Sequence, residues 1–82
     1  MYKSKKPTKT KKQFYNFMER NKNHGVVGRK KVGEYIKRNG LIAYNMGAKK
    51  GGGTWVDIKN KNGTLIAELL VKHNQIVWWD VQ

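Results

Sequence analysis

Two patterns of apolar residues follow one another along this chain, the first with the period of a helix and the second with the period of a strand. In each of the first two segments, three apolar residues recur at i, i+3 and i+4, the spacing of one helical face. They are Phe14, Phe17 and Met18 in one segment, and Val32, Tyr35 and Ile36 in the other. The pattern predicts a first helix that begins near Thr10 and ends before Gly25. It predicts a second helix over residues 28–39, with Gly40 as its capping glycine.

After Gly40 the apolar residues alternate with period 2, which is typical of strands. The predicted strands are residues 41–46, 54–59, 64–71 and 75–81. The glycine-rich residues 47–54 form a loop between the first two. Asn62-Gly63 favours a type I′ turn between the second and third, because that turn needs positive φ at both central residues. His73-Asn74 links the last two strands.

Alternation also assigns side chains to the two faces of the sheet. The face placed against the helices carries Val56, Ile58, Leu65, Ala67, Leu69, Val71, Val77, Trp79 and Val81. The opposite face carries Trp55, Asp57, Ile66, Glu68, Trp78 and Asp80. That second face combines aromatic rings with three of the five acids of the chain.

These elements define an α+β fold in which two short N-terminal helices pack on a three- to four-stranded antiparallel meander. A single small domain is expected over residues 13–82. Residues 1–12 are expected to be a disordered basic arm, since they hold six Lys and no periodic apolar residues. The chain has no cysteine, which suits the cytoplasm, and no apolar run approaches the about 18 residues of a membrane span.

Charge is divided unevenly along the chain. Residues 1–38 contain thirteen Lys and Arg against two acids, a net charge of +11, whereas residues 39–82 contain five against three, a net charge of +2. Such a field is costly through self-repulsion. A polyanion offsets that cost by releasing its condensed counterions. The charge therefore indicates a nucleic-acid partner first and an anionic membrane surface second.

We interpret the chain as a non-enzymatic nucleic-acid-binding protein that contacts phosphates and needs no cofactor. The predicted contacts are Arg29, Lys30, Lys31, Lys37 and Arg38 on the second helix, Lys49 and Lys50 in the glycine-rich loop, and Lys11 and Lys12 in the arm. Phosphate contacts give affinity without sequence information. The choice between DNA and RNA stays open.

Two enzymatic alternatives remain. Asp57, Glu68 and Asp80 on adjacent strands resemble a carboxylate set that holds Mg²⁺ for phosphodiester hydrolysis. A metal-free ribonuclease would instead use His24 or His73 with Lys49 or Lys72. No spacing of a base and a nucleophile supports either alternative directly.

A third alternative is an interaction or inhibitor protein that docks on an acidic protein surface. Its patch would be the aromatic face with Trp55, Ile66 and Trp78. The same two Trp rings could stack on unpaired bases or pack against each other across the strands.

Overall fold

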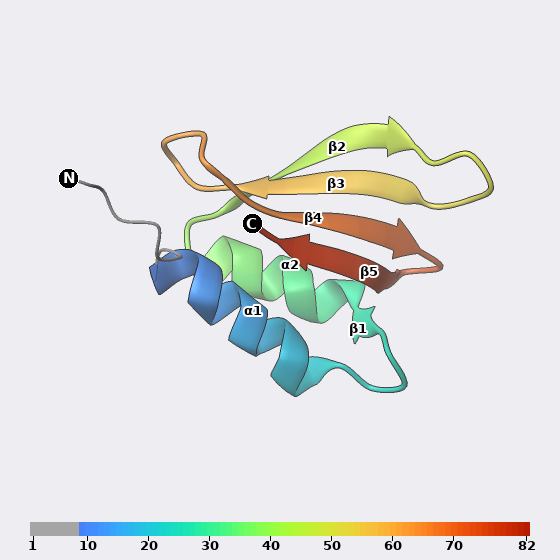
Figure 1. Ribbon diagram of the computed structural model, residues 1–82, viewed down its shortest axis with the longest axis horizontal. Coiled ribbons are helices and arrows are strands. Elements are labelled where there is room, and N and C mark those ends of the chain that lie inside the picture. Colours follow the sequence, from blue (N-terminus) through green and yellow to red (C-terminus); the bar gives the residue numbers. More distant parts are fainter. Residues whose placement is uncertain (1–8) are drawn as a thin grey trace.

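The computed structural model of the protein describes residues 9–82, which form two helices and a five-stranded antiparallel sheet (Figure 1). The elements are α1 (Lys9–Asn21), β1 (Val27–Gly28), α2 (Arg29–Arg38), β2 (Ile42–Ala48), β3 (Thr54–Lys59), β4 (Leu65–Lys72) and β5 (Gln75–Val81). The strand order across the sheet is β1-β5-β4-β3-β2. The predicted α+β fold is therefore confirmed, with one strand more than predicted.

The helices present the predicted apolar stripes to the sheet. Phe14, Phe17 and Met18 of α1 and Val32 of α2 are buried in one core with side chains of β3, β4 and β5. α1 begins at Lys9, so residues 9–12, which we assigned to the basic arm, are its first turn. Residues 1–8 of that arm lie outside the described residues. Only one face of α1 packs against the core, so its remaining positions are polar or charged apart from the exposed Tyr15.

The C-terminus of α2 is capped at Gly40, as the sequence predicted. Asn39 is the C-cap, and Gly40 adopts φ 68°, a left-handed conformation that glycine takes at no steric cost. The N–H of Leu41 then donates to the carbonyl of Ile36 at 2.9 Å, the 6→1 bond of a Schellman motif. Leu41 turns into the core, and the chain leaves α2 toward β2.

The short strand β1 was not predicted, because Val26 and Val27 read as an apolar link. Val27 pairs with Ile76 of β5 and is fully buried. The N–H of Arg29 donates to the carbonyl of Asn74 at 3.0 Å. These bonds fix the start of α2 beside the turn between β4 and β5.

Cross-strand register confirms most of the predicted core face. Ile58 pairs with Ala67, and Val56 pairs with Leu69. Leu69 in turn pairs with Trp79 of β5. Ile58, Ala67 and Leu69 are buried, and Val56 and Trp79 pack against them.

Two β-bulges overturn the face assignments at the strand ends. The register shifts between Ile58 and Lys59, so that Lys59 pairs with Leu65 and Ile66 becomes an extra residue. Ile66 is fully buried, and Leu65 is only half-buried. A bulge adds a residue to one strand, and the side chains beyond it change face. The predictions that Leu65 faces the core and Ile66 faces away were therefore wrong.

The second bulge lies at the start of β5. The register shifts between Leu70 and Val71, so that Val71 pairs with Ile76 and Val77 is the extra residue. Ile76 is 1% exposed and takes the core position that we predicted for Val77. Beyond the bulge Trp79 and Val81 return to the predicted face.

A pair of residues with positive φ occurs at His73-Asn74 and not at Asn62-Gly63, where the type I′ turn was predicted. At Asn62-Gly63 only Gly63 has positive φ, 84°, so the predicted type I′ turn is wrong. The side-chain oxygen of Asn60 accepts hydrogen bonds from the N–H groups of Asn62 and Thr64, each at 2.9 Å, and holds a three-residue loop closed. His73 and Asn74 have φ 55° and 61°, and this pair adopts the positive-φ conformation of a type I′ turn.

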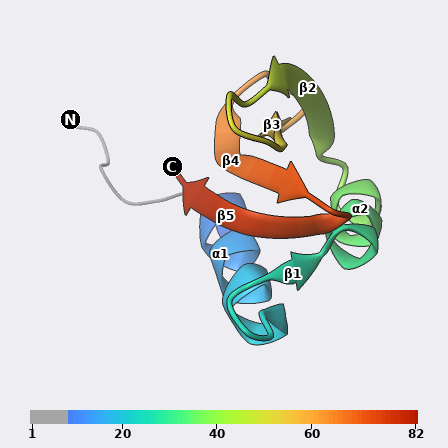
Figure 2. The ribbon, with the colours of Figure 1, turned by 90° about the vertical axis from the view of Figure 1, so that its right-hand side faces the viewer.

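Both helices lie on one face of the sheet, and the other face is uncovered (Figure 2). Trp55 and Asp57 of β3 and their cross-strand partners Leu70 and Glu68 lie on that uncovered face. Neither helix of residues 9–82 is long and apolar enough to cross a membrane.

Candidate nucleic-acid interface

Positive charge is concentrated in the helix layer. Residues 9–38 contain ten Lys and Arg against two acids, a net charge of +8. Lys22 forms an ion pair with Glu19 at 2.7 Å. The hydrogen bond to Glu19 and the charge of its carboxylate raise the pKa of Lys22. Glu34 makes no ion pair with any residue between 9 and 82. Most cations of this layer therefore face solvent without a neutralising partner.

The three acids of the sheet lie on the opposite side of the molecule. Asp57 pairs with Glu68, and Glu68 pairs with Asp80, so the three carboxylates form one row across β3, β4 and β5. Their chain neighbours Val56, Ile58 and Leu69 point into the core under the helices. The sheet thus separates the acidic row from the basic helices.

The five basic residues predicted on α2 are not all on one surface. Arg29, Lys30 and Lys37 line a groove between α2 and the sheet. Arg38 lines a separate cleft between α2 and α1. Lys31 is exposed and lines neither hollow.

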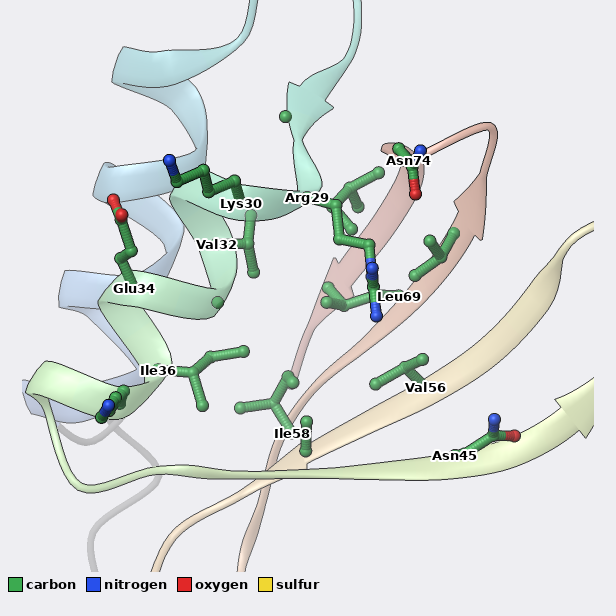
Figure 3. Close-up of a pocket in the computed structure, with 16 residues that line it drawn as sticks. Arg29, Lys30, Val32, Glu34, Ile36, Asn45, Val56, Ile58, Leu69 and Asn74 are labelled. Atoms are coloured by element: carbon green, nitrogen blue, oxygen red, sulfur yellow. The ribbon is translucent and has the colours of Figure 1, made fainter.

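The groove between α2 and the sheet has a volume of about 900 Å³ and a mostly apolar lining (Figure 3). It forms where the helix layer stops covering the sheet, since all residues of β2 are exposed. Ala43 and Asn45 of β2 share the core face with their partners Ile58 and Val56, yet no helix packs over them. The apolar side chains of the floor cannot bind phosphate, so any phosphate contact in the groove depends on its basic residues.

The side chain of Arg29 extends over the floor of this groove. Figure 3 shows its guanidinium group directed toward Leu69 and Val56, whereas Lys30 points away from the groove. Arg29 has no ion pair with any residue that the structure describes. The backbone hydrogen bond to the carbonyl of Asn74 holds the Arg29 backbone in place, so that its guanidinium lies over the apolar floor without an ion-pair partner among the described residues.

The cleft between α1 and α2 has a volume of about 410 Å³ and a polar lining. It is lined by Gln13, Asn16, Arg20, Tyr35, Arg38 and Asn39. Arg20 was missed in the sequence analysis. Its signal was the i, i+3, i+7 spacing with Gln13 and Asn16, which makes a polar stripe beside the apolar stripe of the same helix.

The remaining predicted contacts lie apart from both hollows. Lys49 and Lys50 are in the β2–β3 loop, where the N–H of Lys49 donates to the carbonyl of Gly53 and the N–H of Gly52 to that of Lys49, both at 2.9 Å. The Lys49 ammonium donates to the Lys50 carbonyl at 3.2 Å. These donors are therefore used in hydrogen bonds within the loop. Lys11 and Lys12 stand in the first turns of α1, and neither lines the groove or the cleft.

The row of carboxylates does not form a metal centre by its geometry. Among residues 9–82 there is no group of three His, Cys, Asp or Glu side chains arranged to hold a metal ion. Carboxylates directly opposite one another on neighbouring strands repel. The three acids thus share a row, as the metal-dependent nuclease alternative required, without the convergence that it also required.

The two histidines occupy turns. His24 has φ 55° in the turn between α1 and β1, and His73 has φ 55° in the turn between β4 and β5. Both are exposed. Neither makes a hydrogen bond or ion pair with another residue of the described chain, so no oriented base is assembled around them.

Trp55 and Trp78 pack against each other on the uncovered face. Their ring centroids are 5.7 Å apart and their planes are nearly perpendicular, at 87°. Each pairs with Leu70 of the strand between them. Of the two alternatives for these rings, mutual packing is the one observed, and Trp78 keeps 44% of its surface exposed.

No family model, curated protein or solved structure matches this chain.

Proposed function

We propose that this protein binds nucleic acid without catalysis, through phosphate contacts made by its helix layer. The observation that carries the proposal is the separation of charge: ten basic residues lie in the helix layer, and the acids of the sheet lie in a row on the far face. A polyanion that approaches the helices meets a net positive surface and avoids the carboxylates. Neutralised phosphates would release counterions, which supplies the driving force.

Within this proposal, we choose the principal contacts from the basic residues that line the groove and the cleft. Arg29, Lys37 and Arg38 line hollows of the helix layer, and we assign them the principal contacts with Lys30 and Lys31 beside them. Lys49 and Lys50 become peripheral contacts in this proposal, because their loop is closed on itself. The protein reads no base edges in this scheme, so affinity depends on charge more than on sequence.

A salt titration tests the proposal. The affinity of the full chain for duplex DNA, duplex RNA and single strands is measured by fluorescence anisotropy at several salt concentrations. With about five to eight phosphate contacts, log K should fall against log salt with a slope of about −4 to −7 on duplex DNA. A slope near zero, or no binding to any of these polymers at moderate salt, would overturn it and favour docking on a protein surface.

A further inference from the structure

The cleft between α1 and α2 brings together two arginines from different helices. Arg20 stands in the last turn of α1 and Arg38 in the last turn of α2. Both line the same 410 Å³ hollow. Neither makes an ion pair with any residue of the described chain. Two guanidinium groups that face one hollow without a carboxylate repel each other, and an anion between them would relieve that repulsion.

The other residues that line the cleft supply neutral hydrogen-bonding groups. Gln13 and Asn16 extend the α1 side of the cleft, and Asn39 lies beside Arg38 at the end of α2. Asn39 already donates its side-chain amide to the Tyr35 carbonyl at 2.9 Å, which fixes its orientation. Among residues 9–82, no acidic side chain lines the cleft. The two guanidinium groups and the amide N–H groups therefore favour an anion over a cation in this lining.

Tyr35 forms an ordered wall of the cleft. Its ring stacks on Phe17 at 4.2 Å between centroids and meets the edge of Phe14 at 5.7 Å. Burial raises the pKa of the Tyr35 hydroxyl, while the charges of Arg20 and Arg38 act in the opposite direction. Arg20, Arg38 and Tyr35 line the same cleft, so the charges of two different helices meet beside this hydroxyl.

We infer that this cleft is a specific phosphate site, in which Arg20 and Arg38 together hold one phosphate group of the bound nucleic acid. The inference rests on the proposed function and narrows it to two residues. A guanidinium group donates two parallel hydrogen bonds to phosphate oxygens, a geometry that an ammonium group cannot reproduce. Two such groups from two helices would fix the register of the nucleic-acid backbone on the helix layer.

Charge-removing variants test the site against a matched control. Arg20→Gln and Arg38→Gln remove one guanidinium each, and Lys31→Gln removes an exposed charge of the same helix layer that lines neither hollow. Each arginine variant should weaken binding of duplex DNA at least about tenfold, because hydrogen bonds between charged groups are the strong ones. Lys31→Gln should weaken binding by less and reduce the salt slope by about 1. Arg20→Lys and Arg38→Lys should restore the salt slope without restoring the affinity.

Tyr35 gives a second measurement that does not depend on nucleic acid. Inorganic phosphate in the cleft would screen the two arginines from the Tyr35 hydroxyl, so the pKa of Tyr35 should rise when phosphate replaces chloride at equal ionic strength. Ultraviolet absorbance of tyrosinate follows that titration, and the difference between wild type and Tyr35→Phe isolates the residue from the other three tyrosines.

The results of these two experiments distinguish a failure of the cleft site from a failure of the proposed function. If duplex binding keeps its steep salt slope but the arginine variants weaken it no more than Lys31→Gln does, the cleft site is wrong and the function stands. If inorganic phosphate shifts the Tyr35 titration and no nucleic acid is bound, the function is wrong and the cleft is a phosphate site for another ligand. Absence of any Tyr35 shift in phosphate would also overturn the site.

Discussion

The ring of Phe17 in α1 stacks on the ring of Tyr35 in α2, with centroids 4.2 Å apart and planes inclined by 29°. Phe14 closes the cluster with its ring 5.7 Å from Tyr35 in an edge-on arrangement. This aromatic contact joins the two helices directly. Tyr35 also lines the cleft that Arg20 and Arg38 line.

Truncation of the stacked ring should separate the helices. Phe17 is 8% exposed, so Phe17→Ala should lower the free energy of unfolding by about 3–5 kcal/mol. Tyr35→Phe keeps the ring and should cost less than about 1 kcal/mol. Urea unfolding of both variants measures the difference. Equal losses would show that the hydroxyl, not the stacked ring, holds Tyr35 in place.

Alkaline pH should destabilise the protein partly through Tyr35. Burial raises the pKa of its hydroxyl above the ordinary value of 10.0, so the folded chain holds this proton more tightly than the unfolded chain does. Its contribution to stability is complete below pH 10 and is lost as the pH rises through the folded pKa. The melting temperatures of wild type and Tyr35→Phe should differ little at pH 8, and above pH 10 that of the wild type should fall more steeply. Lysines titrate in both chains, so only the difference between them is informative.

The bulge in β4 makes a prediction that reverses the simple alternation of the sequence. Ile66 is fully buried and Leu65 is half-buried. Ile66→Ala should therefore cost about 2–5 kcal/mol and Leu65→Ala distinctly less. Urea unfolding compares the two. A larger loss for Leu65→Ala would mean that the strand continues in regular register and that Leu65 faces the helices.

The same bulge shows which parts of the fold the sequence could predict. Period-3.6 and period-2 patterns identified both helices and four strands, because each pattern reports which residues share a face. A bulge inserts one residue without changing composition, so alternation placed Leu65 and Val77 on the wrong face. β1 has only two residues, and its pairing with β5 is a contact between distant segments. No local pattern could reveal it.

The candidate site could be predicted only in part, because it also depends on contacts between segments that are distant in the sequence. The count of charges identified α2 as basic, but it could not show which of its residues face a hollow. Arg20 was missed because its role depends on where Arg38 lies, and the packing of α1 beside α2 decides that. Lys49 and Lys50 looked like a phosphate loop, yet the hydrogen bonds of the loop close it internally.

Gly33 should be replaceable with a gain in stability. It lies inside α2, and a Cβ atom added there would meet no atom within 4 Å outside the backbone of the helix itself, so there is room for a side chain at this position. Gly33→Ala should raise the free energy of unfolding by about 1 kcal/mol, because alanine restricts the unfolded chain and favours helix. Thermal unfolding measures it.

Gly53→Ala is the matched control for that substitution. Gly53 has φ 95°, and its added Cβ would lie 3.0 Å from Leu70 Cδ1 and 3.1 Å from the Val71 carbonyl oxygen. This variant should lose stability through both strain and crowding. If Gly33→Ala also loses stability, the interior of α2 is more crowded than the structure indicates.

The acidic row gives the last prediction, which sets binding against catalysis. Glu68 stands between Asp57 and Asp80 on the neighbouring strands, and like charges directly opposite one another destabilise a sheet. Glu68→Gln should therefore raise the free energy of unfolding by about 0.2–1 kcal/mol and leave nucleic-acid affinity unchanged or slightly higher. Glu34→Gln, an exposed acid of α2 without a facing carboxylate, is the control and should gain no stability. The two variants and the wild type are then incubated with DNA and RNA in Mg²⁺ or Mn²⁺. Cleavage by the wild type that Glu68→Gln abolishes and Glu34→Gln retains would make the row a nuclease site, with the basic helices holding its substrate.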